Sequence, residues 1–152
     1  MSVEEKIKEA GITIPVPPKP VGAYVPCVQT GAYLYTSGQL PLVAGKLEYR
    51  GKVGRDLTLE EANQAARICA LNCLGVVKEA LGSLDKVKKI VKVTGFVHSE
   101  SNFYDQPKVI NGASELLGEL FGEPGRHARS AVGVNALPLG AAVEIEMVVE
   151  IA

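Results

Sequence analysis

The sequence has no large excess of positive or negative charge and no long apolar run. Its 152 residues hold 16 Lys and Arg against 17 Asp and Glu, which gives a formal net charge of -1. Nucleic-acid-binding proteins usually carry a basic excess, so we do not expect a nucleic-acid partner. No stretch approaches the roughly 18 apolar residues that a membrane span needs, so we expect no membrane association.

Cysteine and histidine are scarce. Three cysteines without a CxxC pair do not resemble a secreted disulfide scaffold. The charged N-terminal segment SVEEKIKEAG lacks the apolar core of a signal peptide. Both observations favour a cytoplasmic protein. Cys69 and Cys73 would be neighbours on a helix, but only His98 and His127 could complete a zinc site. We therefore expect no metal and interpret the two cysteines as buried core residues.

The motifs that hold nucleotides or activate a serine are also missing. Neither GxGxxG nor GK[ST] occurs, so dinucleotide-binding and P-loop proteins are excluded. A serine hydrolase of the nucleophile-elbow type would need GxSxG, which is absent too. We expect no nucleotide, flavin or nicotinamide cofactor.

Two long amphipathic helices are the clearest elements. Thr58 and Glu61 form a capping box before a run of small apolar residues that ends at Gly82. A second helix is predicted from about Asp105 to Gly122. Residues 1–20 read as a short capped helix followed by a proline-rich extended arm, and residues 21–152 read as one α+β domain.

Runs with alternating or β-branched residues predict the strands. In the last strand, Val143 and Ile145 would face the core while Glu144 and Glu146 face away. Two helices cover one side of such a sheet, so we predict a mixed sheet with an open face that also carries Tyr33 and Tyr35. The predicted strands are 23–30, 32–37, 87–97, 128–134 and 142–151, with one edge strand inside the loop 38–56. The last two are predicted to pair as a hairpin around ALPLG, and Val91, Val93 and Val97 to share one face.

Arg129 is the most suggestive single residue, because its neighbours in the strand are small. A guanidinium with room around it binds a carboxylate through two parallel hydrogen bonds. The hairpin would bring Glu144 close to the level of Arg129. From spacing alone, an ordinary cross-strand ion pair between these two residues is the preferred interpretation.

The segments PVGAYVPCVQTGAYLYTSGQLP and ARSAVGVNALPLGAAVEIE resemble the RidA/YjgF family of reactive imine and enamine deaminases. The resemblance runs from about Val21 to Ile151. It implies a chorismate-mutase-like α+β fold and a homotrimer with sites between subunits. It also implies a small carboxylate-bearing substrate.

The resemblance assigns roles to individual residues. Arg129 matches the arginine that holds the substrate carboxylate, and Glu144 matches the glutamate that positions water near the substrate nitrogen. The remaining matches are to substrate-binding positions of the family: Tyr24, Ser37, Gly38 and Asn111.

One position departs from the family pattern. The deaminases usually place a cysteine two residues after the arginine, where this chain has Ala131. A thiol at this position is excluded, although the backbone there could still contact the substrate. The leading hypothesis is hydrolysis of 2-imino or enamine acids to 2-keto acids and ammonia. The alternatives are a non-catalytic keto-acid-binding protein and, third, an endoribonuclease.

Overall fold

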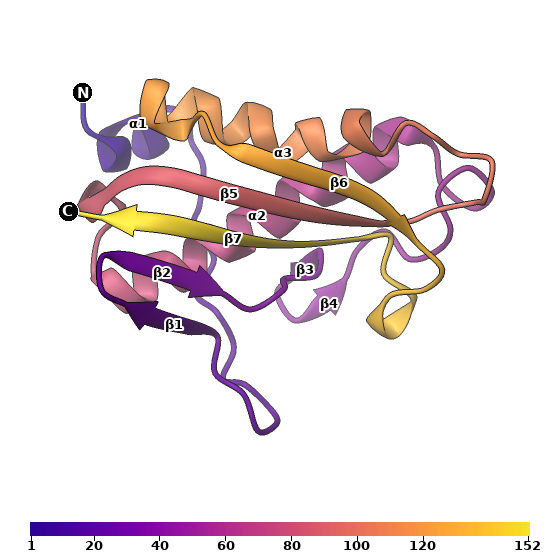
Figure 1. Cartoon of the computed structure of the whole chain (residues 1–152), viewed down its shortest axis with the longest axis horizontal. Coiled ribbons are helices and arrows are strands. Elements are labelled where there is room, and N and C mark those ends of the chain that lie inside the picture. Colours follow the sequence, from indigo (N-terminus) through magenta and orange to yellow (C-terminus); the bar gives the residue numbers. More distant parts are fainter.

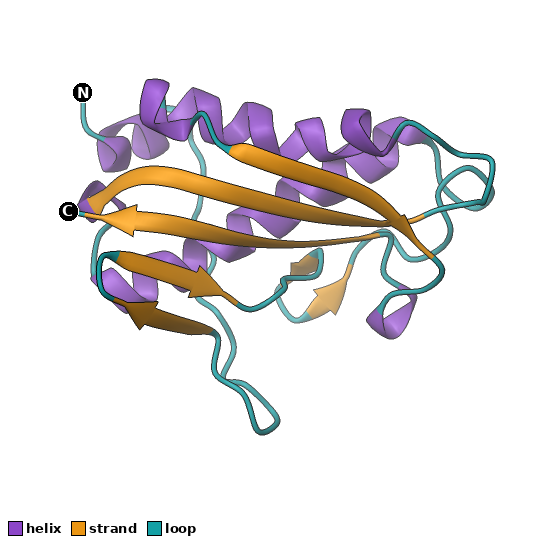
Figure 2. Cartoon of the chain, in the orientation of Figure 1, coloured by secondary structure: helices purple, strands orange, loops and turns teal.

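The computed structural model describes residues 1–152 and shows a mixed sheet with helices packed on one of its faces (Figures 1 and 2). Helices α2 (Leu59–Leu81) and α3 (Gln106–Phe121) form that layer. This arrangement confirms the predicted α+β class. The five strands follow one another across the sheet in the order β1 (Cys27–Thr30), β2 (Tyr33–Thr36), β7 (Val143–Ile151), β5 (Val87–His98) and β6 (Ala128–Val134).

Helix α2 begins and ends where its sequence predicts. The Thr58 hydroxyl accepts from the Glu61 amide at 3.2 Å, and the Glu61 carboxylate accepts from the Thr58 amide at 3.0 Å. Such a cap stabilises a helix by about 1 kcal/mol. Gly82 ends the helix with a φ of 87°, a left-handed conformation that glycine adopts without steric cost.

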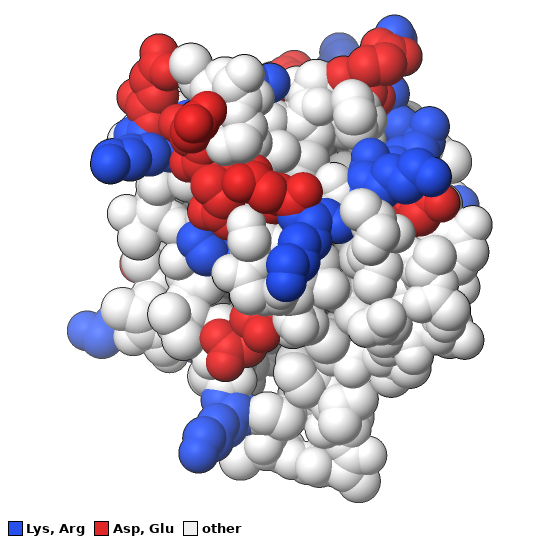
Figure 3. Space-filling model, turned by 90° about the vertical axis from the view of Figure 1, so that its left-hand side faces the viewer, with Lys and Arg blue, Asp and Glu red and all other residues white.

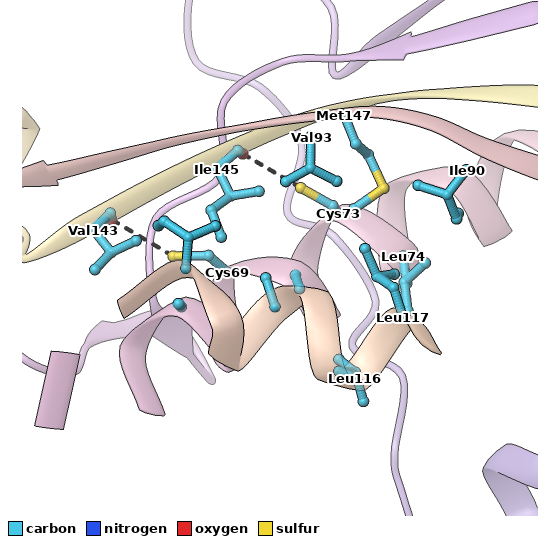
Figure 4. Close-up of a cluster of buried hydrophobic side chains, with 14 of the residues drawn as sticks. Cys69, Cys73, Leu74, Ile90, Val93, Leu116, Leu117, Val143, Ile145 and Met147 are labelled. Atoms are coloured by element: carbon cyan, nitrogen blue, oxygen red, sulfur yellow. Dashed lines mark hydrogen bonds between the residues drawn. The ribbon is translucent and has the colours of Figure 1, made fainter. Parts of the chain in front are cut away.

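Small residues let the two long helices and the sheet approach one another closely. A Cβ at Gly112 of α3 would overlap the Asn63 carbonyl of α2. The thiols of Cys69 and Cys73 lie in the core against β7 and donate to the carbonyl oxygens of Val143 and Ile145, at 3.5 and 3.3 Å (Figure 4). Their interpretation as core residues is confirmed. Nowhere do three His, Cys, Asp or Glu side chains group as metal ligands would.

The predicted hairpin between the last two strands is wrong. β5 lies between them, parallel to β6 and antiparallel to β7. Strand β5, helix α3 and strand β6 form a β-α-β unit, and a helix of this length carries the chain back to a parallel partner. The chain after β6 then passes through a short 3-10 turn, η3 (Pro138–Gly140), to the other side of β5. The apolar pattern of a strand does not determine which other strand it pairs with.

Three smaller predictions also need correction. The first strand starts at Cys27 rather than residue 23, because Pro26 has no N–H to offer the ladder. Irregular pairing in β5 turns Ile90, and not Val91, into the core. The edge strand expected inside the 38–56 loop instead forms a separate two-stranded sheet, β3 (Leu42–Val43) with β4 (Lys46–Leu47).

The N-terminal segment lies along the helical layer. Helix α1 (Val3–Glu9) carries its own capping box from Ser2 and Glu5. Glu4 accepts from the Leu84 amide at 2.7 Å and from Lys78 at 2.9 Å. Further on, the Pro15 carbonyl lies against Gly75 of α2, where a Cβ would overlap it. The short 3-10 turns η1 (Leu84–Lys86) and η2 (Glu123–Gly125) complete the fold.

The sheet face opposite the helices is open, as predicted. Tyr33 and Tyr35 are 42% and 46% exposed, and Val28 and Val132 are exposed by 54% and 43%. The surface seen in Figure 3 mixes Lys and Arg with Asp and Glu and shows no broad region of one sign. No helix has the length and apolar character needed to cross a membrane.

Candidate functional site

Arg129 lies on the edge strand β6 with its side chain toward α3. Its Nη1 donates to Asn111 Oδ1 at 2.8 Å and to Ser114 Oγ at 3.2 Å. Asn111 and Ser114 are one turn apart on α3, so both side chains reach the same place. Arg129 forms no ion pair, and no group of the chain accepts from its Nε or Nη2. These two nitrogens form the planar fork that fits a carboxylate.

His127 and Ser114 extend this network, and the sequence alone did not predict a role for either. Ser114 Oγ lies 2.9 Å from His127 Nε2, and His127 Nδ1 lies 2.7 Å from the Gly125 carbonyl oxygen. With Asn111 and Arg129 they line an open hollow of about 330 Å³ that has no hydrophobic side chain in its wall. The position of Ser114, three residues after Asn111 on the same helix, is the sequence signal for its place in this network.

Glu144 is half-buried on β7 and has no partner within the chain. It lies between the core residues Val143 and Ile145, so its side chain projects from the open face. Burial raises the pKa of its carboxyl group, and the nearby Glu146 carboxylate raises it further. Gly38 lies directly against this carboxylate, because a Cβ at position 38 would overlap it.

Hydrogen bonds hold Ser37 and Gly38 beside β7 and join the loop of Tyr24 to Ser37. Gln39 and Ile145 exchange two backbone bonds at 2.7 and 3.0 Å, which places the 37–39 segment beside β7. The Ser37 hydroxyl donates to the Val25 carbonyl at 2.6 Å. This bond ties the loop that contains Tyr24 to the same region, and the Tyr24 side chain is 58% exposed.

The structure therefore contains two separate groups of predicted site residues. Arg129 pairs with Val93 and Glu144 pairs with Phe96, so they project from opposite faces of the sheet. The predicted ion pair between them is wrong, because β5 separates their strands and their side chains face apart. Ala131 lies on the Arg129 side, two residues further along β6. We call Arg129, Asn111 and Ala131 the arginine group, and Glu144, Gly38, Ser37 and Tyr24 the glutamate group.

Another hollow, of about 400 Å³, lies beyond the far end of β6 near Ser99, Gln106 and Gly133. None of the predicted site residues lines it. Its wall contains one acid, Glu100, which is paired with Lys52 at 3.7 Å. The chemistry expected from the sequence does not converge there.

The comparisons with known proteins cover almost the whole chain. Residues 4–151 match the family model described as "YjgF/chorismate mutase-like, putative endoribonuclease". The chain is 45% identical to Protein TCP17 of Trypanosoma cruzi over 98% of its own length and 94% of that protein. It is 36% identical to the 2-iminobutanoate/2-iminopropanoate deaminase of Dermatophagoides farinae, over 92% of this chain and 94% of that one.

A solved structure shows the same fold. The protein Atu1372 from Agrobacterium tumefaciens superimposes with a TM-score of 0.92 at 48% identity, over 99% of this chain and 92% of that one. The fold, the family model and the relatives agree with the resemblance carried by the two sequence segments. The chain belongs to the RidA/YjgF family.

Proposed function

We propose that this protein hydrolyses 2-imino or enamine acids to 2-keto acids and ammonia, at sites formed between two copies of the chain. The observation that carries the proposal is the guanidinium of Arg129. It is held at one nitrogen by Asn111 and Ser114 and leaves its Nε and Nη2 free. A relative at 36% identity is named a 2-iminobutanoate/2-iminopropanoate deaminase.

A site between subunits follows from the orientation of the two groups. Arg129 and Glu144 point away from each other within one chain, so they can meet only if they come from different copies. A head-to-tail interface places the arginine group of one copy against the glutamate group of the next, and a closed ring uses both groups of every copy. The exposed apolar side chains of the open face, Tyr35 and Val132 among them, supply surface for this contact. We propose a trimer.

The reaction assigns one task to each group. Arg129 binds the substrate carboxylate bidentately and fixes the orientation of the adjacent C=N bond. Glu144, whose pKa is raised by burial, holds a water molecule and passes a proton through it to the imine nitrogen. The water oxygen adds to the carbon and returns a proton to Glu144. The hydroxyl of the resulting carbinolamine then loses its proton to the nitrogen as the C–N bond breaks, which leaves the keto group and releases ammonia. Gly38 leaves room for the Glu144 carboxylate because it has no side chain.

The direct test is ammonia release from enzymatically generated iminopropanoate, with and without the protein. The proposal predicts faster release with the wild-type chain and none above background with Arg129→Lys or Glu144→Gln. Equal release with and without the wild-type protein would contradict deamination.

A non-catalytic keto-acid-binding protein is the second candidate. The observation that favours it is Ala131, which stands where the deaminases usually have a cysteine. It predicts tight binding of 2-oxobutanoate without accelerated ammonia release. Endoribonuclease activity, which the family description names, finds less support. His127 and His98 flank opposite ends of β6, roughly 20 Å apart for a seven-residue strand, so no histidine pair is available for acid–base cleavage of RNA.

A further inference from the structure

With a neutral His127 ring, the network around Arg129 allows one direction for each hydrogen bond. The Gly125 carbonyl oxygen can only accept, so the His127 Nδ1 that lies 2.7 Å from it carries the hydrogen. In a neutral imidazole the other nitrogen, Nε2, is then an acceptor. Ser114 Oγ lies 2.9 Å from Nε2 and must therefore donate its hydrogen to His127.

A serine whose hydrogen is directed at His127 presents oxygen lone pairs to its other neighbour. That neighbour is Arg129 Nη1, at 3.2 Å. Nη1 has two hydrogens, and Asn111 accepts the other one at 2.8 Å. Both hydrogens of Nη1 are thus used, and because the guanidinium is planar, the direction of the Nε and Nη2 fork is fixed as well.

We propose that His127 is a positioning residue for substrate binding: its neutral, Nδ1-protonated ring orients Ser114, and Ser114 orients the carboxylate-binding fork of Arg129. This assignment rests on the proposed role of Arg129 as the carboxylate ligand. His127 makes no contact with the substrate in this arrangement, since Ser114 and Arg129 lie between them. Its effect is to preorganise the fork, which lowers the cost of ordering it when the carboxylate binds.

The ring tautomer of His127 is measured by ¹⁵N NMR of histidine-labelled protein at pH 8, where an ordinary histidine is neutral. The chain has two histidines, so His98→Phe leaves His127 as the only signal and gives its assignment. We expect Nδ1 to carry the hydrogen and Nε2 to be unprotonated. A ring protonated at Nε2 alone would overturn the proposal, and this result does not depend on any enzymatic activity.

The consequence for binding is measured by calorimetric titration of 2-oxobutanoate. His127→Phe removes the acceptor, so affinity should fall about five- to tenfold, the effect of one lost hydrogen bond. In the imine assay KM should rise by the same factor with kcat nearly unchanged. His127→Gln restores an acceptor oxygen near the position of Nε2 and should stay within about twofold of wild type.

The matched control is His98→Phe, the same substitution at the histidine on the open face. It should bind 2-oxobutanoate like wild type, and melting curves should show that all three variants remain folded. If His127→Phe binds as tightly as wild type, the positioning role is overturned while the proposed function stands. If the wild-type protein itself binds no 2-oxobutanoate, the role of Arg129 fails, and the role of His127 falls with it.

Discussion

At the residue scale, the proposed function depends on Arg129 and Glu144, and each side chain has hydrogen-bonding groups without a partner in its own chain. Arg129 has donors without acceptors. Glu144 is half-buried without a hydrogen-bond partner, which disfavours its charged form. Such groups are expected where a ligand or a neighbouring subunit completes the hydrogen bonding.

Arg129→Lys should separate a carboxylate clamp from a structural role. Lysine keeps the charge but lacks the fork, so 2-oxobutanoate affinity should fall roughly ten- to a hundredfold, corresponding to a charge-assisted pair. Calorimetry checks the affinity, and the melting temperature should change little. Unchanged affinity in a folded variant would end the clamp interpretation.

Gly38→Ala should abolish most turnover without unfolding the chain. Its Cβ would overlap the Glu144 carboxylate, which must then move from its place beside Gly38. We expect kcat to fall at least tenfold, because misplacing a catalytic group by about 1 Å has effects of this order. Gly45→Ala is a control for the loss of a glycine, since nothing lies within 4 Å of its added Cβ. Because Gly45 has a positive φ of 80°, some loss of stability is expected there, but no loss of kcat.

The raised pKa of Glu144 predicts how Glu144→Gln changes stability with pH. The pKa of this carboxyl group is higher in the folded state than in the unfolded state. The protonated group therefore stabilises the fold at pH values below its unfolded-state pKa, and this stabilisation is lost as pH rises through its folded-state pKa. Glu144→Gln should therefore match wild type near pH 4 and be the more stable of the two at pH 8. Denaturant melts at the two pH values check this, and a variant less stable than wild type at pH 8 would contradict it.

At the scale of elements, the sequence predicts the features that depend on residues close together in the chain. The capping boxes of Ser2 and Thr58 and the stop at Gly82 are local, and all are present. The open face was also predictable, because alternation in β7 assigns Val143 and Glu144 to opposite faces. The order of the strands was not predictable, because the choice between β5 and β6 as the neighbour of β7 depends on contacts between residues far apart in the sequence. The arginine and glutamate groups were therefore predicted residue by residue, but their separation was not.

The contact of α1 with the rest of the fold should weaken in acid. Burial pushes the pKa of Glu4 up, but hydrogen bonds from Lys78 and from the Leu84 amide bring it below its usual value. The stability that Glu4 contributes is present above its unfolded pKa and is lost as pH falls through its folded pKa. Limited proteolysis within residues 1–20 should accelerate below about pH 4. Glu4→Gln should show the acid-like rate already at pH 7, whereas the exposed Glu9→Gln should not.

At the scale of the whole molecule, the proposed site requires two copies of the chain to associate. The loop before β1, which contains Tyr24, projects beyond the body of the sheet (Figure 1). Light scattering at micromolar concentration should give three times the 16.1 kDa chain mass. A monomer at that concentration would remove the basis for a site between subunits.

Mixed oligomers test the division of the site directly. Arg129→Lys and Glu144→Gln should each be inactive alone. If each site takes its arginine and its glutamate from different copies, a refolded one-to-one mixture regains intact sites at about one interface in four. Ammonia release near a quarter of the wild-type rate is the expected result. No recovery in a verified mixed trimer would place both residues in the same subunit's site.

The thiols of the core have a practical consequence. Burial raises the pKa of Cys73 to about 12 and that of Cys69 well above its usual value, so the native state holds almost no thiolate at either position. Alkylating reagents attack the thiolate, and they can reach these sulfurs only when α2 separates from β7. The rate at which Cys69 and Cys73 are labelled, in a chain with Cys27 replaced by Ser, should therefore report the opening of the core itself. Alkylation of these two cysteines therefore measures the rate of core opening in every variant above.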